Sequence, residues 1–122
     1  MRGMAHQCDA LVVCCIDFRF QKYIREWLDV NLKDLTYDLV GFAGASKDLE
    51  TILKQLEISA RLHHIKRVVL IHHEDCGAYG AASTLENHTR DLKKAGKEIK
   101  LRYPLLQIKT FYLHLDGTFE KV

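Results

Sequence analysis

Two uninterrupted apolar runs constrain the fold of this chain more than any other feature. Residues 10–16 read Ala-Leu-Val-Val-Cys-Cys-Ile, and residues 67–72 carry Val-Val-Leu-Ile between an arginine and a histidine. A strand buried on one face alternates apolar and polar residues, whereas a continuous short apolar run is typical of a strand buried on both faces. Such strands are found mostly in parallel sheets that helices cover on both sides. We therefore predict an α/β fold.

The segments between these runs supply the other elements of such a fold. Three segments have apolar residues at helical spacing, and a short apolar segment that fits a strand follows each of them. Pro104 ends the third helical segment, and Asp116-Gly117 is a strong hairpin signal. The predicted helices are 20–32, 47–64 with Ser46 as the N-cap, and 83–102, and the predicted strands are 10–16, 37–42, 67–72, 108–115 and 118–122. We expect a single domain, residues 1–122, with a mostly parallel sheet of strand order 2-1-3-4 and a C-terminal β-hairpin strand.

Length and charge limit the classes of function. The chain has 122 residues, with 18 Lys and Arg against 16 Asp and Glu, and a formal net charge of +2. The two signs are interspersed, which argues against an electrostatic nucleic-acid or membrane partner. No apolar stretch approaches the ~20 residues that a bilayer span needs, and the N-terminus lacks a signal-peptide core. We expect a cytoplasmic protein.

The cysteines fit a reducing compartment. Disulfide frameworks belong mostly to small secreted chains, so thiols here are expected to be core residues, metal ligands or nucleophiles. Successive side chains of a strand point to opposite faces, so Cys14 and Cys15 have different surroundings. We assign Cys14 to the core, the commonest place for a free cysteine. Cys15 is instead a candidate for a functional site, because Asp17 and Arg19 follow it on the same side of the strand. The four cysteines are Cys8, Cys14, Cys15 and Cys76.

Two short motifs follow the first and third predicted strands. The first is Cys15-Ile-Asp-Phe-Arg19, and the second is His73-Glu-Asp-Cys-Gly77. In a doubly wound sheet, ligands bind outside the carboxyl ends of the strands, where the strand order reverses, so we expect the motifs to meet. Two thiolates and one imidazole suit zinc and leave its fourth position open. The metal ligands predicted in this way are Cys15, His73 and Cys76.

The neighbouring polar residues fit the same interpretation. Asp17 can accept a hydrogen bond from a zinc-bound hydroxide or bind the metal itself, and Arg19 can hold it off the metal through a bidentate pair. His72 is an alternative ligand, but the His-x-x-Cys spacing favours His73. The remaining cysteine and histidines are interpreted as surface or helix-face residues: His6, Cys8, His63, His64, His88 and His114.

Together the two motifs resemble the zinc-site signature of the β-class carbonic anhydrases. The segments 56–62, 67–77 and 111–122 are similar to the family's helix, zinc loop and closing hairpin, so the resemblance covers nearly the whole chain. It implies one Zn²⁺ per chain and the reversible hydration of carbon dioxide to bicarbonate. It also implies a catalytic dyad of Asp17 and Arg19, with Asp17 as a fourth zinc ligand in a closed state. The expected assembly is a homodimer or larger homo-oligomer, with the cleft at the subunit interface.

One segment departs from the family pattern. Residues 41–44 read Gly-Phe-Ala-Gly where the family usually has Arg-Asn-Ala-Gly, and the family's long N-terminal helices have no counterpart before residue 10. An apolar pocket beside Phe42 would suit another small linear substrate, carbon disulfide or carbonyl sulfide. A non-catalytic zinc-binding or thiol-sensing protein is the third hypothesis. The candidate pocket residues are Phe42, Ala43, Gly44 and Gly77.

Overall fold

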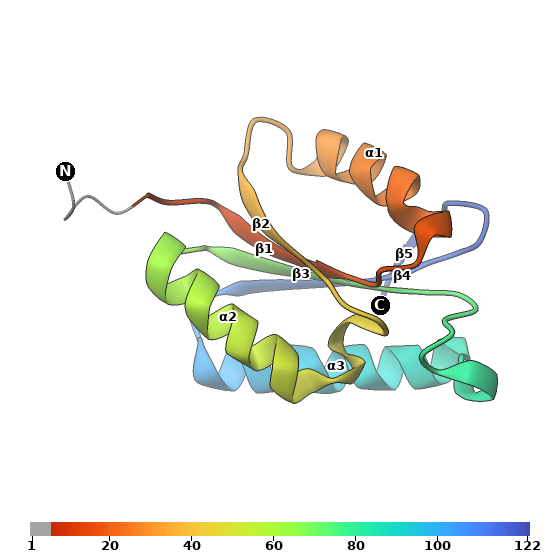
Figure 1. Cartoon of the computed structure of the whole chain (residues 1–122). Coiled ribbons are helices and arrows are strands. Elements are labelled where there is room, and N and C mark those ends of the chain that lie inside the picture. Colours follow the sequence, from red (N-terminus) through yellow and green to blue (C-terminus); the bar gives the residue numbers. More distant parts are fainter. Residues whose placement is uncertain (1–5) are drawn as a thin grey trace.

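The fold is a twisted sheet between two layers of helices (Figure 1). The computed structural model describes residues 6–122. Within these residues it contains five strands and three α-helices, joined in places by short 3₁₀ turns. The strands are β1 (Ala10–Cys14), β2 (Tyr37–Gly41), β3 (Arg67–His73), β4 (Gln107–Leu113) and β5 (Phe119–Lys121), and the helices are α1 (Gln21–Asn31), α2 (Leu49–His63) and α3 (Leu85–Arg102).

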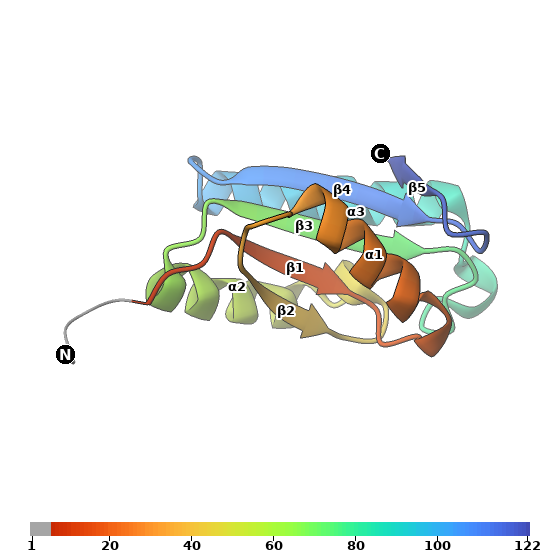
Figure 2. The ribbon, with the colours of Figure 1, turned by 90° about the horizontal axis from the view of Figure 1, so that it is seen from above.

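The strand order confirms the predicted topology. The sheet runs β2-β1-β3-β4-β5, as Figure 2 shows from above. β1 pairs in parallel with both β2 and β3, and β3 pairs in parallel with β4. Only β5 is antiparallel, and it returns beside β4 as the hairpin strand. The order reverses at β1, so the crevice beyond the ends of β1 and β3 is the place where this type of sheet binds its ligands.

The two faces of the sheet form two separate hydrophobic cores. Leu11 and Val13 of β1 pack with α2 and α3, whereas Val12 and Cys14 pack with α1 on the other face. β3 alternates in the same way, which explains why both runs are apolar throughout. Cys14 is 1% exposed, so its assignment to the core is confirmed. None of the helices of residues 6–122 combines the length and apolarity that a membrane crossing requires.

One predicted helix boundary is wrong for a reason that bears on the site. α2 begins at Leu49, and its N-cap is Asp48, whose carboxylate accepts a hydrogen bond from the Thr51 amide. Ser46, the predicted cap, is 2% exposed and lies 2.7 Å from Nε2 of His72. A serine and an aspartate are equally good caps, so sequence alone did not distinguish them. The serine forms part of a buried polar network instead.

The burial of α2 makes a prediction about stability. We expect Leu56→Ala to lower the free energy of unfolding by about 2–5 kcal/mol, because it leaves a cavity at a fully buried position. Leu62→Ala on the same helix is the matched control, since Leu62 is 45% exposed, and its effect should stay within about 0.5 kcal/mol. Denaturant unfolding measures both, and equal losses would contradict the described core.

Candidate metal centre

Two thiols and an imidazole come together beyond the ends of β1 and β3. Cys15 follows the last residue of β1, His73 is the last residue of β3, and Cys76 lies in the next turn. One ligand atom from each of the three lies within 4.8 Å of the other two. All three side chains are buried, with exposures of 6% or less. The pairing of β1 with β3 therefore brings together the residues that the two motifs singled out.

The orientation of His73 suits a metal ligand. Its Nδ1–H donates a hydrogen bond of 2.7 Å to the Glu74 carbonyl, which leaves Nε2 as the ring nitrogen available to a ligand. Nε2 is buried and has no hydrogen-bond partner. The ring stacks on Phe20 at a centroid distance of 4.1 Å, which holds its plane in place. A buried nitrogen lone pair without a partner costs free energy unless a ligand meets it.

The two thiols are electrostatically coupled. The pKa of Cys15 is lowered to about 3, chiefly because the Cys76 thiol donates to it, and the pKa of Cys76 is raised by the same contact. The Gly44 amide also donates to Cys15 Sγ, at 3.4 Å. Cys15 is therefore the thiol of the pair that ionises first. Zinc binds thiolates and neutral imidazole in a tetrahedral arrangement, so this donor set fits a zinc ion with one position to spare.

An aspartate–arginine pair borders the three side chains. Arg19 Nη2 donates to Asp17 Oδ2 at 2.7 Å, and Nε contacts both carboxylate oxygens at 3.2 Å. The hydrogen bonds from Arg19 are the main reason that the pKa of Asp17 is lowered. Asp17 Oδ2 lies 3.8 Å from His73 Nε2. On its other side Arg19 contacts Asp75, whose carboxylate and carbonyl accept from it at 3.1 and 2.9 Å. Asp75 was not predicted; it fixes the guanidinium between two carboxylates.

A cavity of about 580 Å³ opens from this group to solvent. Of the four predicted pocket residues, Ala43 and Gly77 line it. Phe42 instead packs against the core that β1 and β3 share with α2 and α3, and Gly44 is buried beneath. The apolar part of the cavity comes from residues that sequence reasoning did not single out: Ile16, Phe18 and Ala78.

Comparison with known proteins assigns the family. Residues 5–122 match a protein family described as "Putative carbonic anhydrase". The chain belongs to this carbonic anhydrase family. An uncharacterized protein from Rickettsia bellii is 33% identical over 140 residues, which cover 96% of this chain and 83% of that protein.

Solved structures agree with the family's fold. A β-carbonic anhydrase from Trichomonas vaginalis superposes with a TM-score of 0.70 at 16% identity, covering 98% of this chain and 84% of that chain. A carbon disulfide hydrolase in its apo form superposes with a TM-score of 0.66 at 13% identity, covering 98% and 81%. At such identities the likeness concerns the fold alone.

Behind the metal centre, this carbonic anhydrase-family chain carries a buried polar network. His72 and His88 face each other, Nδ1 to Nδ1, at 2.9 Å, and Ser83 Oγ lies 2.9 Å from His88 Nε2. The same serine oxygen accepts from the Cys76 amide at 2.8 Å. Burial lowers the pKa of His72 to about 3 and that of His88 to about 4, so both rings are neutral. The network braces the turn that carries Cys76.

The structure corrects the interpretation of His88. It is fully buried, whereas a surface or helix-face position was predicted. Its spacing from Leu92, Ala95 and Ile99 places it on the inward face of α3. The helical period of the sequence therefore already indicated an inward position for this histidine. Leu85, which the same period suggested as an inward residue, is 41% exposed. The hydrogen-bond partners Ser83 and His72 explain why a histidine takes the inward position.

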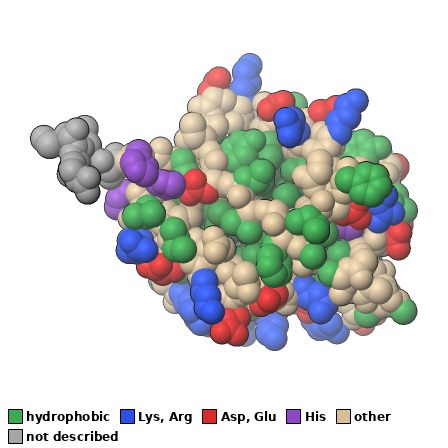
Figure 3. All heavy atoms as spheres, in the orientation of Figure 1, with side chains coloured by type: hydrophobic (Ala, Val, Ile, Leu, Met, Phe, Trp, Pro, Cys, Tyr) green, Lys and Arg blue, Asp and Glu red, His purple; other side chains and the backbone are tan. Residues whose placement is uncertain are grey.

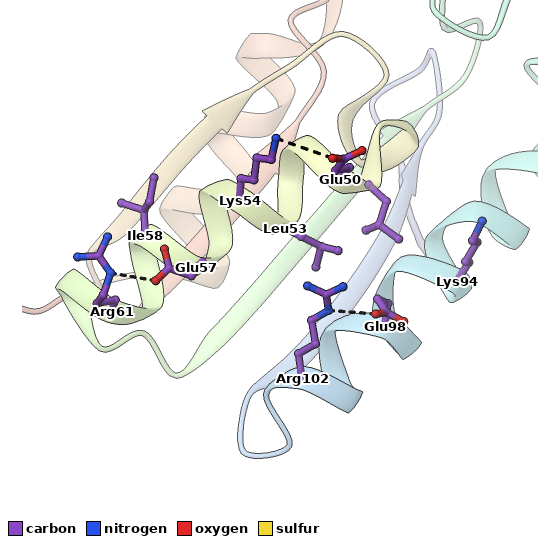
Figure 4. A pocket seen from close by; sticks show the side chains of 10 residues that line it. Glu50, Leu53, Lys54, Glu57, Ile58, Arg61, Lys94, Glu98 and Arg102 are labelled. Carbon is purple, nitrogen blue, oxygen red and sulfur yellow. Dashed lines mark hydrogen bonds and ion pairs between the residues drawn. The ribbon is translucent and has the colours of Figure 1, made fainter.

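A larger hollow lies away from the metal centre. It is a groove of about 840 Å³ between α2 and α3, shown in Figure 4. Most of its charged side chains pair with one another along each helix, as in Lys54–Glu50 and Arg102–Glu98. Such exposed i,i+4 pairs contribute little to stability and offer no reactive group. The groove therefore offers less for catalysis than the thiol–imidazole cluster does.

The turn that carries Gly44 makes a second prediction. Gly44 has φ +80°, and an added Cβ would lie 3.0 Å from the Ala78 Cβ. We expect Gly44→Ala to cost about 1–3 kcal/mol of unfolding free energy, because an alanine is strained in this conformation. Gly77→Ala is the matched control: nothing lies within 4 Å of its added Cβ, so unfolding should change little. A neutral Gly44→Ala would contradict the described turn.

Proposed function

We propose that this chain is a zinc-dependent carbonic anhydrase that reversibly hydrates carbon dioxide to bicarbonate. The observation that carries the proposal is the buried cluster of Cys15, His73 and Cys76, in which His73 Nε2 has no hydrogen-bond partner. These three side chains would hold the ion. Zinc lowers the pKa of a bound water toward neutrality, and that is the chemistry it would supply here.

Asp17 and Arg19 orient the reaction in this proposal. Arg19 holds both carboxylate oxygens of Asp17, so the carboxylate keeps one direction and remains ionised. A fixed carboxylate 3.8 Å from the ligand nitrogen can accept a hydrogen bond from the attacking nucleophile and align it with the substrate. Asp75 acts as the anchor of the guanidinium rather than as a catalytic group.

The test is carbon dioxide hydration by stopped flow on protein whose zinc content has been measured. We expect activity that rises above neutral pH, because two thiolates reduce the charge of the ion and make its bound water less acidic. Asp17→Asn should lose about 10²-fold in rate or more with the metal retained. Asp29→Asn, at an exposed position on α1, is the control and should keep full activity.

Metal removal gives a separate readout. We expect a chelator to abolish activity and zinc to restore it, and Cys76→Ser to lower the zinc content at the centre. Full zinc without hydration at any pH, and an Asp17→Asn variant with unchanged properties, would favour the non-catalytic zinc-binding or thiol-sensing alternative.

A second substrate class has support from the cavity lining. Ile16, Phe18 and Ala78 give the cavity an apolar wall, which suits a neutral linear molecule such as carbon disulfide or carbonyl sulfide. A carbon disulfide hydrolase has the same fold. Turnover of carbon dioxide but not of the sulfur compounds would exclude this alternative.

A homodimer or larger homo-oligomer is part of the proposal. Ile16, Phe18 and Leu39 are 63%, 86% and 57% exposed, and the first two border the cavity. Apolar side chains exposed at the mouth of a site favour a surface that another subunit covers. Sedimentation of the purified chain measures the assembly, and a monomer with full activity would contradict this part.

A further inference from the structure

A second cluster of metal-ligating side chains lies at the other end of β1. Cys8 precedes β1, Asp38 lies in the edge strand β2, and His63 is the last residue of α2. A ligand atom from each lies within 4.8 Å of the other two. At ~3.3 Å per strand residue, Cys8 and Cys15 are about 20 Å apart, so the two clusters are separate.

The three side chains are held in place by local contacts. His63 Nδ1 lies 2.7 Å from Asp38 Oδ2, and Ser59 Oγ donates to the same oxygen at 2.6 Å. The Cys8 amide donates to the His63 carbonyl at 3.1 Å, which fixes the chain before β1 against the end of α2. Asp38, Ser59 and His63 also line a hollow of about 250 Å³, through which an ion can reach them.

The surroundings favour a cation. α2 ends at this point, with His64 in a left-handed cap, and the carbonyl end of a helix carries a partial negative charge. The side chains of His63 and Asp38 are 26% and 30% exposed, so the cluster is accessible without being fully solvated. The His6 ring lies near the His63 ring, at a centroid distance of 4.8 Å and tilted by 55°. In Figure 3 histidine side chains gather on the surface beside the N-terminal residues, next to acidic atoms.

We propose that Cys8, Asp38 and His63 form a second metal site, specific for a divalent ion of the zinc type. Sulfur, nitrogen and carboxylate oxygen are the three donor kinds that zinc takes in tetrahedral sites, whereas calcium and magnesium prefer oxygen alone. The thiolate and the carboxylate together balance the charge of the ion. The site is separate from the proposed catalytic function and does not depend on it.

Binding changes the hydrogen bonds of the cluster in a defined way. Ligand atoms on a tetrahedral zinc with bonds of about 2.0 Å are about 3.3 Å apart, so an ion between Asp38 and His63 widens their 2.7 Å contact and displaces the shared proton. Burial, followed by the charge of Asp38, raises the pKa of Cys8, so without metal the thiol keeps its proton. Two ligand–zinc bonds replace the hydrogen bond between Asp38 and His63. The Cys8 thiol releases its proton to solvent, and a neutral His63 that binds through Nδ1 carries its proton on Nε2 instead.

An ion bound at this site would cross-link the fold. The ion ties three elements that are far apart in sequence: the segment before β1, the exposed edge strand β2 and the end of α2. Because the unfolded chain does not bring these ligands together, binding shifts the folding equilibrium toward the native state.

The test compares metal content and melting temperature among full-length variants equilibrated with zinc. We expect Cys8→Ser to hold one zinc per chain fewer than the wild type, and to lose the part of the zinc-induced rise in melting temperature that the second site supplies. His64→Asn is the matched control: it removes the adjacent imidazole, keeps a residue that accepts the left-handed cap, and should bind as much zinc as the wild type.

A second variant keeps the proposal testable if Cys8→Ser does not fold. Asp38→Asn keeps the shape of the side chain and should weaken zinc binding at this site by about tenfold or more. Because the first centre is untouched, the difference between variant and wild type reports on the second site whether or not the chain hydrates carbon dioxide. Equal zinc content and equal melting shifts in wild type, Cys8→Ser and Asp38→Asn would overturn the proposal and leave the cluster as a hydrogen-bonded anchor.

Discussion

The structure depends on the parallel pairing of β1 with β3. Residues Ala10 to Val13 pair with Arg67 to Leu70, so both strands run in one direction and end at the same edge of the sheet. Because the strand order reverses at β1, no helix covers the crevice beyond those ends. Cys15 and His73 project there from two rigid strands, and the short turn that follows β3 adds Cys76. The pairing of the strands therefore fixes the relative positions of these side chains.

Behind the centre, a network of buried polar side chains holds the turn that carries Cys76 in place. Buried side chains of this kind destabilise a core unless each finds a partner. Here Ser46, His72, His88 and Ser83 satisfy one another, and Tyr79 donates to Asp91 at the border of the network at 2.7 Å. The chain of contacts ends on the amide of Cys76. A purely apolar core would leave that amide without a partner and the turn less defined.

The polar clusters at the two ends of β1 differ in how deeply their side chains are buried. At the carboxyl end the thiols and the imidazole are almost fully buried, and Arg19 closes the group against Asp17 and Asp75. At the amino end the thiol, imidazole and carboxylate are half-buried and lie beside an edge strand.

The sequence by itself determined the fold class, the strand order and the meeting of the two motifs. Continuous apolar runs are compatible with strands buried on both faces, and motifs placed at the ends of such strands have few other places to meet. The Cys15-x-Asp17-x-Arg19 motif also predicted the ion pair, although the chain is not extended there. Asp17 caps the 3₁₀ turn Phe18–Phe20, and its carboxylate accepts from both the amide and the guanidinium of Arg19. These features depend on short-range periodicity, which a sequence records directly.

Only the tertiary structure decided which polar residues face inward and with what partners. Ser46 and Asp48 are both good helix caps. Asp48 caps α2, because Ser46 instead contacts His72, which is distant in sequence. His88 is tolerated in the core because Ser83 and His72 meet its two nitrogens. Phe42 turns into the core and leaves the cavity wall to Ile16 and Phe18. Such outcomes depend on contacts between separate elements, and no local pattern encodes them.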